Sequence, residues 1–187
     1  MQPYLTNISC LAISGSLRQD SSNTRLLEAA AECAPPEVTV EIYTKLGDLP
    51  HFNPDHDPRH FESVEVLTRK VRCAHGIIVS TPEYAHGLPG ALKNAFDWLV
   101  GSDAFVNKPF IMLLNASARS VYAQQSLVEI LKTMSGIEIE LASTTIPLLG
   151  RNYDRAAILA QADFSKRIHE ALSIFVKAIR AHNQQFV

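Results

Sequence analysis

The stretch Ile13–Leu27 reads ISGSLRQDSSNTRLL and joins an apolar run, Ile8–Ile13, to a helical pattern that begins near Ser22. The apolar run is typical of a buried strand, and Gly15 permits a tight turn directly after it. A helix that begins there has first-turn N–H groups without partners inside the helix, and its macrodipole adds partial positive charge. The stretch therefore predicts a strand, a loop and a helix N-terminus that favours an anion.

The same loop is rich in side chains that donate hydrogen bonds to phosphate oxygens. These side chains are Ser16, Arg18, Ser21, Ser22, Asn23 and Thr24. Neither Gly-x-Gly-x-x-Gly nor the Gly-Lys-Ser/Thr of nucleoside triphosphatases is present, which favours a phosphomonoester held directly by the protein. The alternative interpretation is an ordinary helix N-terminus with one of these polar residues as its cap.

Composition describes a globular chain of 187 residues, 47% hydrophobic and 19% charged, which we expect to form one domain over residues 1–187. A formal net charge of −2 provides no general attraction to nucleic acid or to an anionic membrane. Three cysteines without a Cys-x-x-Cys spacing indicate neither a disulfide framework nor a zinc site. No apolar segment approaches membrane-spanning length, so we expect a cytoplasmic protein.

Strand-like and helix-like patterns alternate along the chain. Beyond the first strand, the strands are expected at Val38–Tyr43, Gly76–Thr81, Pro109–Asn115 and Ile137–Leu141, the last continuing through Thr144–Leu148. Helices are expected at Ser22–Cys33, Phe61–Cys73, Ala91–Val100, Val121–Ser135 and Asp154–Asn183. Such alternation predicts a parallel sheet with helices on both faces, and the order 2-1-3-4-5 would bring the loops after strands one, three and four to one crevice.

The polar loop Thr44–His60 contains several histidines and aspartates, but their spacing matches no established ligand pattern. Proline-punctuated loops collect such residues because they are solvated. We therefore expect no metal site there.

A second motif, Thr81–Trp98, reads TPEYAHGLPGALKNAFDW, and the first, Gly15–Leu26, reads GSLRQDSSNTRL. The pair resembles the signatures GSLRxxSxNxxL and TPEYxxxxPGxLKNxxDW of the NAD(P)H-dependent FMN reductases, which include quinone, chromate and azo-compound reductases. The resemblance implies an α/β flavodoxin-like three-layer sandwich with a five-stranded parallel sheet of order 2-1-3-4-5. It also implies noncovalently bound FMN in a homodimer or homotetramer.

The resemblance places the cofactor residue by residue. The phosphate falls on Ser16, Arg18, Ser21, Asn23 and Thr24; the ring falls on Pro82, Glu83, Tyr84, Ala85, His86 and Gly87; Ser117 faces the pyrimidine edge. Backbone N–H groups of the second loop would favour the electron-rich reduced flavin. Glu83 is expected to orient this loop rather than to act as a general acid, and no catalytic protein residue is expected, because the flavin N5 carries the chemistry.

The function implied is hydride transfer from NADPH or NADH to FMN, followed by delivery of two electrons to a small acceptor such as a quinone, chromate, an azo compound or free flavin. The alternative is a flavodoxin-type electron carrier without nicotinamide turnover. The Ser/Arg/Asn loop and the net charge of −2 disfavour that carrier, whose phosphate loop is usually threonine-rich and whose surface is strongly acidic.

Two departures from the family pattern bear on specificity. Ala85-His86 stands where many relatives carry Asn after the tyrosine, so His86 would replace a side-chain contact or leave it missing. The loop after the fourth strand, usually rich in glycine, carries Arg119, which we hypothesise stabilises negative charge on the reduced flavin or binds an anionic substrate. The sequence leaves open the physiological acceptor, the choice of NADH or NADPH, and the choice of dimer or tetramer.

Overall fold

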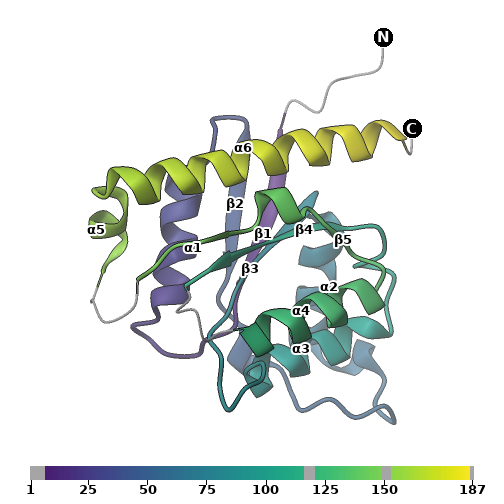
Figure 1. The fold of residues 1–187 in the computed structure, drawn as a ribbon. Coiled ribbons are helices and arrows are strands. Elements are labelled where there is room, and N and C mark those ends of the chain that lie inside the picture. The colour runs from purple at the N-terminus through teal and green to yellow at the C-terminus, as the bar shows by residue number, and fades with distance from the viewer. Residues whose placement is uncertain (1–6, 116–120, 149–152, 186–187) are drawn as a thin grey trace.

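A computed structural model describes residues 7–115, 121–148 and 153–185 (Figure 1). The strands are β1 (Ile8–Ser14), β2 (Val38–Tyr43), β3 (Gly76–Ser80), β4 (Pro109–Leu114), β5 (Ile137–Glu138) and β6 (Thr144–Thr145). The helices are α1 (Ser22–Glu32), α2 (Glu62–Cys73), α3 (Gly90–Val100), α4 (Val121–Thr133), α5 (Arg155–Leu159) and α6 (Ala162–Gln185).

The strands form one sheet in the order β2-β1-β3-β4-β5, and every pair is parallel. This confirms the predicted order. The fifth position differs from the expected continuous strand, because a 3-10 turn at Glu140–Ala142 separates β5 from β6, which also pairs with β4. Across this break the Ser143 hydroxyl accepts a hydrogen bond from the Met112 N–H at 3.0 Å. The side chain thus satisfies a β4 amide that a continuous strand would have paired with its backbone.

Helices cover both faces of the sheet and bury two separate hydrophobic clusters (Figure 1). One cluster joins the sheet to α2, α3 and α4, and the other joins it to α1, α5 and α6. In β3, Ile77 and Val79 lie in the first cluster and Ile78 in the second, all fully buried. The uninterrupted apolar run of this strand therefore reflects burial on both faces.

The C-terminal segment corrects the expectation of a single helix over Asp154–Asn183, because it forms α5 and α6. The Asp154 carboxylate caps α5 by accepting a hydrogen bond from the Ala157 N–H at 2.7 Å. The Ser165 hydroxyl donates to the Leu159 carbonyl at 2.6 Å and so satisfies the end of α5. Among the described residues, none of the helices combines the length and the apolar character needed to cross a membrane.

Candidate functional site

The carboxyl ends of three adjacent strands, β1, β3 and β4, meet the N-terminus of α1 at one edge of the sheet. Three consecutive residues of α1 each bind the end of a different strand. The pairs are Ser22 with Asn115 after β4, Asn23 with Ser80 of β3 at 3.0 Å, and Thr24 with Ser14 of β1 at 2.9 Å. The start of α1 is therefore fixed to this edge of the sheet by side-chain hydrogen bonds as well as by its apolar face.

Gly15 brings the two motif loops into direct contact. Its N–H donates to the Ser80 carbonyl at 2.8 Å. A Cβ added at this position would lie 2.2 Å from Thr81 Oγ1 and 2.9 Å from Leu92 Cδ2, closer than non-bonded atoms approach. The first motif needs glycine here because the second motif packs directly against its backbone.

The predicted phosphate residues fall into two groups. Ser21 is the N-cap of α1, its hydroxyl accepting from the Thr24 N–H at 3.4 Å, so the capping interpretation holds for this residue. Asn23 is buried and its Oδ1 accepts from Ser80, while Ser16 is half-buried and Arg18 is exposed. These four residues lie at or before the N-terminus of α1. Ser21 and Asn23 are buried there, whereas the side chains of Ser16 and Arg18 face solvent.

Arg18 is a cation of this loop whose side chain has no partner among the described residues. In the described part of the chain no carboxylate or carbonyl binds its guanidinium, although its backbone N–H donates to Ser16 Oγ at 3.3 Å. Arg25 one turn into α1 is already engaged, with an ion pair to Asp20 at 2.7 Å. An unpaired guanidinium beside a helix N-terminus suits an anionic ligand.

The second motif begins with a tight turn. Tyr84 and Gly87 exchange two backbone hydrogen bonds of 3.0 Å. The two residues between them, Ala85 and His86, have φ angles of 49° and 59°, the left-handed conformation that this type of turn requires and that Asn and Gly favour. Within residues 7–115, 121–148 and 153–185, the N–H groups of Ala85 and His86 make no backbone hydrogen bond. The turn thus leaves two adjacent N–H donors for a ligand.

This turn is fastened to the start of α4. The Glu83 carboxylate accepts a hydrogen bond from the Ala123 N–H at 2.9 Å, and the His86 ring stacks on Tyr122 with centroids 4.6 Å apart and planes at 21°. Tyr84 and Tyr122 are about half exposed. Neither Tyr122 nor Ser80 is predicted from the motifs; for Ser80, a hydroxyl at the end of a wholly apolar strand is the signal in the sequence.

The helical part of the second motif acts on the loop before α2. Asn94 accepts from the Phe52 N–H at 2.7 Å and donates to the Pro50 carbonyl at 2.9 Å, and Trp98 Nε1 donates to the same carbonyl at 2.8 Å. Trp98 is buried. Lys93 forms an ion pair with Asp97 on the exposed face of α3. Asn94 and Trp98 therefore hold the loop before α2 against α3.

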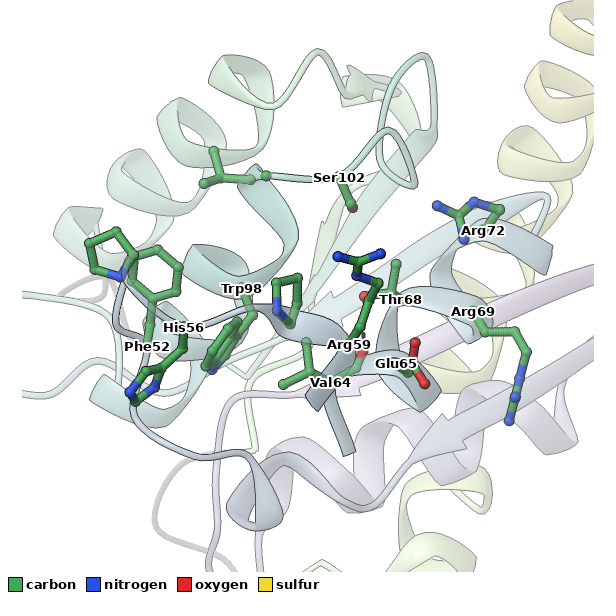
Figure 2. A pocket seen from close by; sticks show the side chains of 14 residues that line it. Phe52, His56, Arg59, Val64, Glu65, Thr68, Arg69, Arg72, Trp98 and Ser102 are labelled. Atoms are coloured by element: carbon green, nitrogen blue, oxygen red, sulfur yellow. Dashed lines mark hydrogen bonds between the residues drawn. The ribbon is translucent and has the colours of Figure 1, made fainter. Parts of the chain in front are cut away.

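A cavity of about 580 Å³ lies apart from this site, between the loop before α2 and helices α2 and α3 (Figure 2). Trp98 is its one lining residue from either motif. Three arginines line it: Arg59 and Arg72 are paired with Asp57 and Asp103, both at 2.6 Å, and Arg69 makes no ion pair in the described part of the chain. Within the described residues, the loops after β1 and β3 contribute nothing to the lining of this cavity, so it is separate from the place where the two motif loops meet.

Two predicted residues, Ser117 and Arg119, lie outside the described residues. Asn115, which precedes them, has an Oδ1 that is buried without a hydrogen-bond partner in the described part of the chain.

Known proteins resemble this chain in sequence and in structure. A family model described as NADPH-dependent FMN reductase matches residues 8–147. The subunit CrdA of an NADH:(hydroxy)cinnamate reductase from Vibrio ruber is 34% identical over 150 residues, which cover 76% of this chain and 71% of the relative. A 2-hydroxy-1,4-benzoquinone reductase from Burkholderia sp. is 38% identical over 84 residues, and this match spans less than half of either protein, 45% of each.

Among solved structures, the flavoenzyme NAD(P)H:(acceptor) oxidoreductase FerB from Paracoccus denitrificans superimposes with a TM-score of 0.83 at 25% identity. The match covers 94% of this chain and 98% of FerB. The similarity therefore includes both motif loops and the helices that support them.

Proposed function

Because this chain belongs to the NADPH-dependent FMN reductase family, we propose that it binds FMN and passes two electrons from a nicotinamide to a small quinone-type acceptor. The Burkholderia relative is named as a benzoquinone reductase and FerB as an NAD(P)H:(acceptor) oxidoreductase, which supports this class of reaction. The observation that carries the proposal is the meeting of two loops at one sheet edge. Within the described residues, one loop offers an arginine without an ion pair near a helix N-terminus, and the other offers two N–H donors that make no backbone hydrogen bond.

The phosphate of FMN would be held by the loop after β1. Ser16 and Arg18 have side chains that face solvent, and Ser21 retains its hydroxyl proton while it caps α1. Thr24 donates its single hydroxyl proton to Ser14, so its contribution would be through an oxygen lone pair or through the position of α1. Asn23 would act chiefly by fixing α1 to β3.

The ring would lie against Pro82–Gly87, with the loop at Ser117 on its pyrimidine edge. When bound, FMN supplies the atom that accepts and releases hydride. The chain's part is to hold the ring and to place the N–H groups of Ala85 and His86 at its carbonyl and nitrogen edge. Donors at that edge favour the reduced form, which carries more negative charge.

We propose that the protein is a single-domain, cytoplasmic homodimer or homotetramer. Val121 and Tyr122, beside the turn of the second motif, are 46% and 54% exposed, and exposed apolar side chains grouped beside a site are typical of subunit contacts. Light scattering coupled to size-exclusion chromatography measures the oligomeric state directly.

The test of function is anaerobic reduction of the purified protein reconstituted with FMN. NADPH or NADH should bleach the yellow flavin band, and a benzoquinone should restore it. Binding of FMN without bleaching by either nicotinamide would indicate an electron carrier instead. A chain that stays colourless with micromolar FMN would refute the proposal.

Arg18→Ala tests the phosphate assignment. Hydrogen bonds to charged groups contribute about 1.5–3 kcal/mol, so the FMN dissociation constant should rise roughly 10- to 100-fold. Arg69→Ala is the matched control, because Arg69 is an exposed residue in the C-terminal half of α2, near the opposite edge of the sheet. Titration by flavin fluorescence measures both variants, and equal affinities would remove Arg18 from the site.

A further inference from the structure

The Glu83 side chain leaves the turn of the second motif and reaches a different element. Its Oε2 accepts a hydrogen bond from the N–H of Ala123, the third residue of α4, at 2.9 Å. N–H groups in the first turn of a helix lack partners inside the helix, and the macrodipole favours a negative charge there. The Glu83 carboxylate therefore caps the N-terminus of α4 from its position in the turn of the second motif.

A second contact follows the same path. His86, three residues beyond Glu83, stacks on Tyr122, the neighbour of Ala123. Glu83 precedes the left-handed part of the turn, His86 belongs to it, and both contact the first turn of α4. Left-handed backbone at Ala85 and His86 costs free energy and persists only where the surroundings hold it.

The contact of Glu83 joins the turn to α4, an element that follows it by more than thirty residues in the chain. A change at Glu83 would move the turn relative to α4 without touching the residues after β1.

We propose that Glu83 is a positioning residue that tunes the flavin: through α4 it holds the N–H groups of Ala85 and His86 against the ring edge and favours reduced FMN. The inference rests on the proposed function. Because the loop after β1 would hold the phosphate independently, loss of the cap should alter the preference for reduced over oxidised FMN more than it alters binding of oxidised FMN. Glu83 would act by accepting a hydrogen bond from Ala123, so this role requires no proton transfer between Glu83 and the substrate.

The experiment measures the midpoint potential and the oxidised-FMN dissociation constant of the full-length holoprotein. Glu83→Ala should bind reduced FMN about tenfold less tightly relative to oxidised FMN, which lowers a two-electron midpoint potential by about 30 mV. Glu83→Gln keeps an oxygen that accepts from Ala123 and should stay close to the wild-type potential. Asp154→Ala is the matched control, because it removes a carboxylate that caps α5 in the same way and should leave the potential unchanged.

The outcomes separate the possibilities. An unchanged potential in Glu83→Ala overturns the inference while FMN binding and nicotinamide bleaching by the wild type uphold the proposed function. Equal losses in Glu83→Gln and Glu83→Ala would show that the oxygen that accepts from Ala123 is not what sets the potential, and would also overturn it. If Glu83→Ala does not fold, Glu83→Asp, which is too short to reach Ala123, should show the same lowered potential. A wild-type chain that binds no FMN would refute both proposals.

Discussion

Gly15 lies just after the end of β1, beside the start of the loop that follows β3. Its N–H is bonded to Ser80, and its α-carbon faces Thr81, whose hydroxyl donates to the Pro82 carbonyl at 3.1 Å. A side chain at this position must displace Thr81 or Leu92, and both are buried in packed surroundings. The glycine thus serves packing between two loops, in addition to the turn itself.

Gly15→Ala should destabilise the protein by about 1–3 kcal/mol, the usual cost of inserting a methyl group into filled space. Urea denaturation followed by far-UV circular dichroism measures the free energy of unfolding. Gly101→Ala is the control, because a Cβ at Gly101 meets nothing within 4 Å and its φ of −79° suits alanine. Equal stability of the two variants would contradict the packing argument.

Residues Asn23 and Thr24 mark the limit of what the sequence could predict about the site. The pattern correctly indicated a donor-rich helix N-terminus, because hydroxyl and amide side chains there are visible in the sequence. It could not tell a donor for a ligand from a donor for another strand, since Ser80 and Ser14 use the same chemistry. That distinction depends on which strand ends lie nearby, and therefore on the fold.

At the scale of elements, α3 is the support for the loop between β2 and α2. Asn94 and Trp98, one turn apart, both bind the Pro50 carbonyl, and Asn94 also accepts from the Phe52 N–H. The rings of Phe52 and Phe61 pack on Trp98 with centroids 5.2 and 5.4 Å away. A loop with several prolines thereby gains a fixed attachment to the helix.

Asn94→Ala removes one bond to a carbonyl and one from an N–H, and should lower the free energy of unfolding by about 1–3 kcal/mol. Tryptic cleavage after Arg59 should also become faster, because the loop opens more often. Lys93→Ala removes only an exposed ion pair with Asp97 and should cost less than about 1 kcal/mol with no change in cleavage. Unchanged cleavage in Asn94→Ala would show that the aromatic contacts alone fix the loop.

Some secondary-structure elements could be predicted from the sequence and others could not. The strand Gly76–Ser80 was predictable because burial on both faces leaves an uninterrupted apolar run. The break between α5 and α6 was not, because Ala160 and Gln161 carry no glycine or proline signal and the ends are fixed by Asp154 and Ser165. A helix boundary set by side-chain bonds across a few residues is invisible to hydrophobic periodicity.

At the scale of the whole molecule, the three cysteines differ in how deeply they are buried. Cys10 is buried in β1, an inner strand of the sheet, and burial raises the pKa of its thiol to about 12. Cys33 follows α1 and is half-buried, its pKa raised by burial and then by the nearby Glu32. Cys73, the last residue of α2, is exposed. Reactivity of each thiol therefore reports a different extent of opening.

A disulfide reagent such as DTNB at pH 8 should modify Cys73 first and Cys33 more slowly. Cys10 should react only through global unfolding, because its thiol in the native chain is almost wholly protonated four pH units below its pKa. FMN that binds the native chain at about 100 times its dissociation constant stabilises that chain by roughly 2.7 kcal/mol, so Cys10 labelling should slow about 100-fold, with Cys73 unaffected. Mass spectrometry of the labelled peptides measures all three rates, with Cys73→Ser as the assignment control. Cys10 labelling as fast as Cys33 in native buffer would contradict a core closed on both faces of the sheet.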